Sequence, residues 1–355
     1  MNLTSAEKHS SRPEQRVQTQ VLSRSVQVWI AESLAKGYTA GQIRTILING
    51  NTPGELADRE IAQAENSPYT YAARRCMVVA RKRESLLKTL DFYHRMNSDY
   101  FRLKKETLPA YKTFIQNFLS INRAGLFSGS FDHWAARHWT PQSLLELVGA
   151  GTKIQVQAGR TGESAYEEKG EKLKRFIPFE ELISAMLHGR GNDLYLTANN
   201  FFLDQSPFAA LREQIGNIGD SYLNSEYLAK SVFLWMGPEG IVTGMHQDLN
   251  HILFCQIYGR KRFRLYPATQ VPYMCNDRWI FSPVDPTQNI PEQHAEFRNA
   301  AAIDITVEPG DMLYIPAGWW HHVTGETASI SISLTNLRGM PNHFIDYPPD
   351  YSSII

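Results

Sequence analysis

The feature that most constrains this chain is a series of short apolar segments after Pro109, separated by glycine and proline residues. Runs of about four to eight residues bounded in this way are typical of β-strands. Many of them in succession favour an antiparallel sandwich or barrel. A helical stretch at residues 179–188 precedes them. The strand-like segments are residues 194–197, 231–236, 251–258, 261–266, 303–307, 312–315 and 329–336.

The residues before Pro109 predict a separate helical module. A helix that begins at Ser25 has its C-cap at Gly37, and Thr39 is placed to cap a second helix. Residues 55–64 and 71–95 predict two more helices. The polar residues at the start of the chain predict disorder. We therefore expect a disordered N-terminus (1–24), a helical module (25–108), a β-rich domain (109–340) and a C-terminal tail (341–355).

The long predicted helix continues into a basic stretch. Between Arg74 and Lys105 there are ten Lys or Arg residues against three acidic residues. Such a charge run is typical of a solvated helix face. The alternative is a docking surface for an acidic partner or peptide.

Composition excludes several classes of protein. The 355 residues contain 36 Lys or Arg and 36 Asp or Glu, which argues against a nucleic-acid binder that works by bulk positive charge. No apolar run reaches the roughly 18–20 residues of a membrane-spanning helix, and residues 1–16 show no secretory signal. The three cysteines are too scattered for a disulfide framework or a zinc cluster. We expect a soluble cytoplasmic protein without nucleic-acid or membrane partners.

A metal site is predicted by His246-Gln247-Asp248, at the start of an apolar strand. Side chains two residues apart on a strand point to the same face, so His246 and Asp248 can converge on one ion. Of the adjacent histidines His321 and His322, which face opposite sides, only one would join them. Two imidazoles and one carboxylate leave three metal positions open, which suits a non-haem Fe(II) that activates oxygen. The alternative is a structural hydrogen-bonded pair of His246 and Asp248.

An anion site is predicted beside the metal. Lys261 shares one face of its strand with two apolar residues, and a lysine there is costly unless an anion meets it. The distal carboxylate of 2-oxoglutarate is such an anion, and a lysine that reaches the surface is the alternative. Asn336 ends the apolar face of residues 330, 332 and 334, and Thr243 lies three residues before His246. Both are candidates to contact the same ligand.

The segments around these residues resemble the cupin-like JmjC hydroxylases, the family of the asparaginyl hydroxylase that inhibits hypoxia-inducible factor. The resemblance covers about residues 175–338 and implies a mainly β fold, a double-stranded β-helix of the jelly-roll or cupin type, following an N-terminal helical module. The similar segments are Thr243-Gly-Met-His-Gln-Asp248, Cys255-Gln-Ile-Tyr-Gly-Arg-Lys-Arg-Phe-Arg-Leu-Tyr-Pro267 and Glu308-Pro-Gly-Asp-Met-Leu-Tyr-Ile-Pro-Ala-Gly-Trp-Trp-His-His-Val323.

The resemblance also implies roles for single residues. It makes His246, Asp248 and His321 the ligands of Fe(II), and Lys261, Thr243, Asn336 and Tyr195 the residues that hold 2-oxoglutarate. One position departs from the family, which often has an asparagine six residues after the first histidine, where this chain has Ile252. Asn250 and His251 are the neighbouring candidates to replace it, although strand parity turns His251 away.

The implied activity is hydroxylation that consumes O2 and 2-oxoglutarate and releases succinate and CO2. The family favours an amino-acid side chain in a peptide or protein as substrate, and a free amino acid or other small molecule is the alternative. Histone demethylation is less expected, because scattered cysteines cannot build the zinc modules that often accompany it. A non-catalytic metal-binding or partner-binding cupin and a zinc hydrolase are further alternatives. Residues 337–355 are too few for the C-terminal helices through which some relatives dimerise, so that mode of dimerisation is not expected.

Overall fold

The computed structural model describes residues 21–163, 165–197, 203, 208–219, 222–224, 231–276, 278–340 and 347. The expected disordered N-terminus and C-terminal tail lie outside these residues, apart from residues 21–24 and 347. The chain forms two compact units, residues 1–85 and 86–355. The division falls inside a long helix rather than after residue 108.

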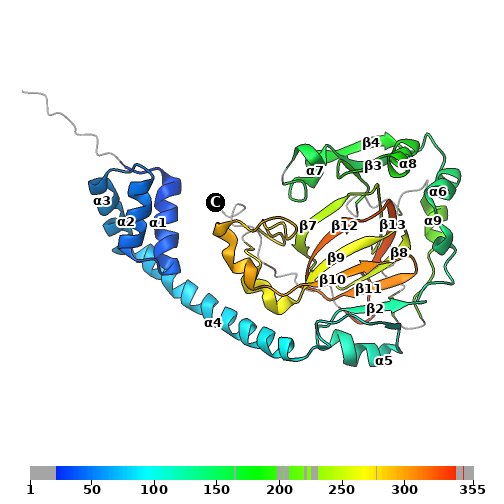
Figure 1. The fold of residues 1–355 in the computed structure, drawn as a ribbon, viewed down its shortest axis with the longest axis horizontal. Helices are drawn as coiled ribbons and strands as arrows, with labels where there is room; N and C mark the ends of the chain where they lie inside the picture. Colours follow the sequence, from blue (N-terminus) through cyan, green and yellow to red (C-terminus); the bar gives the residue numbers. More distant parts are fainter. Residues whose placement is uncertain are drawn as a thin grey trace, which may run out of the picture. The chain divides into compact units, whose positions relative to one another are not determined.

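The first unit contains the predicted helices. The C-cap Gly37 adopts a left-handed conformation with φ of 91°, and Thr39 forms a capping box with Gln42, both as the sequence indicates. Most side chains at residues 71–90 are exposed, which agrees with a solvated helix face. The helices are α1 (Arg24–Lys36), α2 (Ala40–Asn49), α3 (Gly54–Glu65) and α4 (Pro68–Met96), the last of which continues into the second unit (Figure 1).

Two facing β-sheets form the barrel of the second unit, a double-stranded β-helix (Figure 1). The larger sheet has the strand order β1-β2-β11-β8-β13-β6, and the smaller has the order β10-β9-β12-β7. Apolar side chains from both, among them Phe254, Phe263 and Leu313, pack together between the sheets. The strands are β1 (Lys105–Thr107), β2 (Gly125–Ser128), β6 (Val232–Gly237), β7 (Val242–Gln247), β8 (Ile252–Tyr258), β9 (Lys261–Tyr266), β10 (Ile303–Val307), β11 (Asp311–Ile315), β12 (Trp320–Gly325) and β13 (Ser329–Leu334).

An outer layer covers the other face of the larger sheet. Phe114, Leu144 and Phe179 from helices pack against strand residues such as Cys255 and Ile332. The larger sheet is therefore buried on both faces. This layer includes α5 (Tyr111–Phe114), η1 (Ile115–Leu119), η2 (Ala135–His138), α6 (Pro141–Val148), α7 (Gly170–Leu173), α8 (Phe179–His188), α9 (Ala209–Glu213) and the sheet of β4 (Lys174–Pro178), β3 (Lys153–Ala158) and β5 (Leu194–Tyr195).

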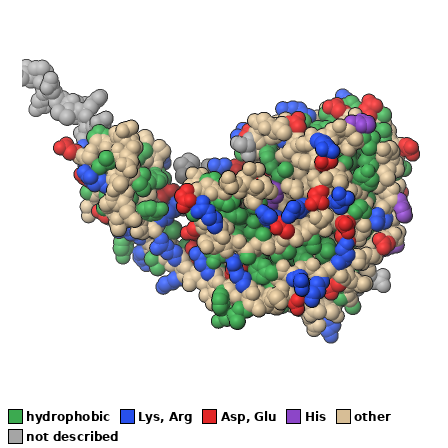
Figure 2. All heavy atoms as spheres, in the orientation of Figure 1, with side chains coloured by type: hydrophobic (Ala, Val, Ile, Leu, Met, Phe, Trp, Pro, Cys, Tyr) green, Lys and Arg blue, Asp and Glu red, His purple; other side chains and the backbone are tan. Residues whose placement is uncertain are grey.

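Each predicted strand segment overlaps a strand of the structure, and α8 has the predicted bounds. The sequence did not predict the helices α5, α6, α7 and α9 or the strands β1–β4, β7 and β12. One placement was wrong: His246 lies near the end of β7 and Asp248 follows that strand, whereas the apolar strand β8 begins only at Ile252. Within the described residues no helix is long and apolar enough to cross a membrane. Positive and negative side chains are interspersed on the visible surface (Figure 2), in line with the even charge count.

Two local features position the strands of the smaller sheet. A two-residue turn at Gly259 and Arg260 carries the chain from β8 in the larger sheet to β9 in the smaller sheet, and Gly259 has φ of 69°. A Cβ there would lie 1.9 Å from the carbonyl oxygen of Ala328, so only glycine fits. At the edge of this sheet, residues 278–282 pair with β7 through Gln247 N–H to Ile280 O (3.0 Å) and Ser282 N–H to Met245 O (3.0 Å).

Candidate active site

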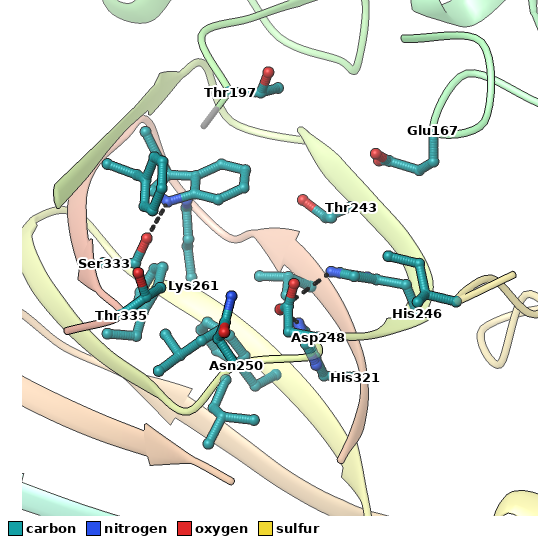
Figure 3. Close-up of a pocket in the computed structure, with 18 of the residues that line it drawn as sticks. Glu167, Thr197, Thr243, His246, Asp248, Asn250, Lys261, His321, Ser333 and Thr335 are labelled. Carbon is teal, nitrogen blue, oxygen red and sulfur yellow. Dashed lines mark hydrogen bonds and ion pairs between the residues drawn. The ribbon is translucent and has the colours of Figure 1, made fainter. Parts of the chain in front are cut away.

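His246, Asp248 and His321 converge at one point of the barrel (Figure 3). The two histidines lie opposite each other on the paired strands β7 and β12, and Asp248 follows β7. One ligand atom from each residue lies within 4.8 Å of the others. Asp248 Oδ2 is 3.3 Å from His321 Nε2 and 3.7 Å from His246 Nε2. His246 and Asp248 thus lie together as their spacing predicts, and His321 is the histidine that the family resemblance implied.

Both imidazoles are oriented by their own strands. His246 Nδ1 lies 2.8 Å from the carbonyl oxygen of Gly244, and His321 Nδ1 lies 3.1 Å from that of Trp319. A carbonyl can only accept, so both Nδ1 atoms carry the proton and both Nε2 atoms keep a free lone pair. His322 faces the other way, with its Nε2 3.8 Å from Asp285. Only His321 of the adjacent pair therefore joins the cluster.

The protonation states of the cluster suit a cation. Burial, aided by the neighbouring His321, lowers the pKa of His246 and favours neutral imidazole. Burial alone would raise the pKa of Asp248, but the close contact with the imidazoles of His321 and His246 outweighs it and lowers that pKa. Two neutral imidazoles and a carboxylate are the forms that bind a divalent ion such as Fe(II). The donor set fits such an ion, and all three side chains line one cavity.

That cavity has a volume of about 370 Å³ and lies between the two sheets. Lys261 lines it, 1% exposed, with Nζ 3.0 Å from the hydroxyl oxygen of Tyr195. Nζ also lies 5.3–5.8 Å from the ring centres of Tyr195, Trp235 and Phe254. Among the described residues no carboxylate forms an ion pair with Lys261, and burial lowers its pKa to about 7. A buried cation without a counter-ion is what an anionic ligand would complete.

The other predicted co-substrate residues divide into two groups. Thr243 and Tyr195 line the cavity, but Asn336 does not. Asn336 follows the face of Ile330 and Ile332, which packs against the outer layer, and its Nδ2 donates to the carbonyl of Asn224 (2.9 Å). An apolar row on a sheet buried on both faces does not have to face the site.

Asn250 and His251, the two candidates to replace the family's asparagine at position 252, lie in different places. Asn250 lines the cavity together with Ile252, whereas His251 lies elsewhere and bonds to Tyr314 (3.0 Å). The other conspicuous aromatic residues pack: Trp319 and Trp320 are 0% exposed and line no part of this cavity.

Several lining residues were not found from the sequence. Ser333 in β13 and Thr335 just after that strand line the cavity, and Ser333 accepts a hydrogen bond from the indole of Trp235 (2.9 Å) (Figure 3). Alternation with the apolar residues of β13 was a usable signal for them. Glu167 and residues 279–281 come from loops, and no local pattern marks them.

Comparison with known proteins agrees with this geometry. The family model described as "Cupin-like domain" matches residues 111–335, more than half of the chain. The chain belongs to the cupin-like domain family. The matched region contains His246, Asp248 and His321.

This cupin-like domain is similar to several JmjC proteins. It is 26% identical over 248 residues to Lysine-specific demethylase JMJ30 of Arabidopsis thaliana, covering 65% of this chain and 54% of that protein. It is 27% identical over 233 residues to Jumonji C domain-containing protein 5 of Drosophila melanogaster, covering 63% of this chain and 57% of that protein. It is 24% identical over 235 residues to HSPB1-associated protein 1 of Bos taurus, covering 61% of this chain and 48% of that protein. The matches span about half the length of these relatives.

Proposed function

We propose that this cupin-like protein is an Fe(II)- and 2-oxoglutarate-dependent oxygenase that hydroxylates an amino-acid side chain in a peptide or protein. One observation carries the proposal. The three-residue cluster and the buried Lys261, which lacks a carboxylate partner among the described residues, line the same cavity. A metal site alone would fit many activities, but a metal site that shares a cavity with an uncompensated cation fits a dicarboxylate co-substrate.

The residues have distinct tasks in this proposal. His246, Asp248 and His321 hold the metal, and Lys261 with Tyr195 binds the distal carboxylate of 2-oxoglutarate. When bound, iron supplies the oxidative chemistry that converts 2-oxoglutarate and O2 to succinate and CO2 and places one oxygen atom in the substrate. The apolar walls exclude water from this chemistry. They are formed by Phe233, Trp235, Phe254, Phe263, Ile315 and Val323.

The co-substrate site is tested first. We would load the full chain with Fe(II) without oxygen, add 2-oxoglutarate and record the visible charge-transfer band of the chelate. The band should be lost in His321→Ala and should need about ten-fold or more 2-oxoglutarate in Lys261→Ala. Iron-loaded protein that shows no band at saturating 2-oxoglutarate would refute the oxygenase and favour a non-catalytic cupin.

The substrate class rests on the relatives and on chemistry. One of them, JMJ30, is named a lysine-specific demethylase, and the resemblance to an asparaginyl hydroxylase supports side-chain hydroxylation. Hydroxylation of an N-methyl carbon and of any other side-chain carbon is the same C–H reaction, so the product distinguishes the two. Peptide products that gain one oxygen atom support the proposal. Loss of a methyl group would assign demethylation, and turnover of free amino acids alone would assign the small-molecule alternative.

A further inference from the structure

A fully buried arginine lies outside the cavity wall. The side chain of Arg160, in η3 (Arg160–Gly162), is 0% exposed, and a buried guanidinium is destabilising unless its N–H groups and its charge are satisfied. Its Nε donates to Asn192 Oδ1 (3.3 Å), and its Nη1 donates to Gln157 Oε1. Its Nη2 donates to Glu167 Oε1 (3.0 Å) and to the carbonyl of Val242 (2.6 Å). Glu167 is the carboxylate that balances this charge.

The same contacts hold the strand that carries the first metal ligand. Val242 begins β7, and its N–H donates to Asn192 Oδ1 (2.8 Å) while its carbonyl accepts from Arg160. Two residues further along, the N–H of Gly244 donates to Glu167 Oε1 (3.3 Å). Three backbone groups of β7 are thus fixed by side chains from outside the barrel.

The last of these contacts leads directly to the metal ligand. The carbonyl of Gly244 accepts from His246 Nδ1 (2.8 Å), the bond that leaves Nε2 free. Gly244 therefore lies between Glu167 and His246, with a hydrogen bond to each. A Cβ on Gly244 would lie 3.4 Å from Glu167 Cγ, which shows how closely the glutamate approaches this strand. Figure 3 shows Glu167 on the side of the cavity nearest His246.

Arg160 also contacts the co-substrate end of the cavity. Its guanidinium carbon lies 5.3 Å from the ring centre of Tyr195, whose hydroxyl contacts Lys261. One buried cation therefore packs beside residues at both ends of the cavity.

We propose that Arg160 and Glu167 are positioning residues that fix the orientation of His246 through the backbone of β7. The inference rests on the proposed metal site but names residues outside the ligand set. Outer groups that orient a ligand change metal affinity by roughly 10–100-fold when they are removed. The buried ion pair thus determines how tightly the site holds its metal.

The test measures metal affinity rather than turnover. Co(II) is titrated into the metal-free full chain and followed by its visible d–d absorption, in wild type, Glu167→Gln, Arg160→Met and the double variant. Each single variant should weaken Co(II) binding about 10–100-fold and shift the absorption spectrum. Because the two residues act as one unit, the double variant should be no weaker than the weaker single variant.

Arg264→Met is the matched control. Arg264 forms a two-fold ion pair with Asp304 on the neighbouring strands β9 and β10, and it lines no part of the cavity. Its variant should bind Co(II) as wild type does, even where thermal unfolding shows a comparable loss of stability. Glu167→Gln preserves the side-chain shape and keeps the test informative if Arg160→Met does not fold.

The outcomes separate the two proposals. Wild type that binds Co(II) in a manner lost in His321→Ala supports the metal site. If folded Glu167→Gln then binds Co(II) as wild type does, or changes no more than Arg264→Met, the positioning role is overturned while the metal site stands. Wild type whose Co(II) affinity is unaffected by His321→Ala overturns both.

Discussion

At the scale of single residues, Lys261 controls the charge of the cavity. Burial lowers its pKa to about 7, so the folded chain without ligand releases this proton as the pH rises past 7, whereas the unfolded chain keeps it until about pH 10.5. Over that interval the unfolded state binds more protons, and the free energy of unfolding therefore rises with pH. Below pH 7 both states are charged, and the folded state carries the full cost of the buried cation.

This predicts proton-coupled binding. An anion beside Lys261 favours the charged form, so binding of 2-oxoglutarate to the Fe(II)-loaded protein at pH 8 should take up close to one proton, and affinity should fall as the pH increases above 7. Oxygen-free calorimetric titrations in buffers of different ionisation enthalpy measure the uptake. Lys261→Met should abolish it. Uptake that persists in that variant would assign the proton to another group.

A second residue-scale prediction concerns Asn336. Family position assigns it to the co-substrate, but the structure places it outside the cavity, bonded to the carbonyl of Asn224. Asn336→Ala should therefore change 2-oxoglutarate affinity by less than about two-fold and lower the free energy of unfolding by roughly 1 kcal/mol. The charge-transfer titration and urea unfolding measure the two effects. A ten-fold loss of affinity with unchanged stability would favour the family assignment.

Single residues also show where prediction from sequence ends. The alternation argument succeeded for Lys261, because one face of β9 lies between the sheets and the other is more polar. It did not bring Asn336 to the cavity, because β13 is buried on both faces and the residues that reach the cavity are Ser333 and, just after the strand, Thr335. Arg160 escaped notice because an arginine between two turn residues is usually exposed, and only the folded chain brings Glu167 to it.

At the scale of helices and strands, the sequence predicted where helices begin and end, but it did not predict a strand whose residues are almost all buried. Helix caps at Gly37 and Thr39 were predicted because capping is local. Strand β12 was missed because its Trp-His-His-Val sequence is almost wholly buried and shows no alternation. Strands β3 and β4 were missed because they pair mainly with each other, in a sheet outside the barrel whose existence depends on distant packing.

The turn from β8 in the larger sheet to β9 in the smaller sheet gives a prediction at this scale. In Gly259→Ala the new Cβ would collide with the backbone of Ala328, and φ of 69° is unfavourable for alanine. We expect the free energy of unfolding to fall by about 2–3 kcal/mol or more. We also expect weaker 2-oxoglutarate binding, because the turn leads directly into Lys261, the first residue of β9.

Urea unfolding and the charge-transfer titration measure these two effects. Gly151→Ala is the control, since no atom lies within 4 Å of its added Cβ. Equal losses of stability in the two variants would show that the close contact and the positive φ of Gly259 do not determine the effect.

At the scale of the whole molecule, the candidate site belongs to one of the two compact units. Every residue that lines the cavity lies in residues 86–355. A chain of residues 86–355 should therefore bind Co(II) and 2-oxoglutarate with affinities within about three-fold of the full chain, since the ligand set and its supporting contacts remain. Calorimetry and the Co(II) spectrum measure this. Loss of binding in a folded fragment would give the first unit a role in the site.

The pairing of residues 278–282 with β7 has a consequence beyond the active site. An unpaired strand at the edge of a sheet offers its backbone to any extended chain that meets it, and such edges start aggregation. In this protein β7 is the edge strand of the smaller sheet, and the segment that covers it also supplies one wall of the cavity. Remodelling that wall to admit a larger substrate would therefore also remove a safeguard against polymerisation.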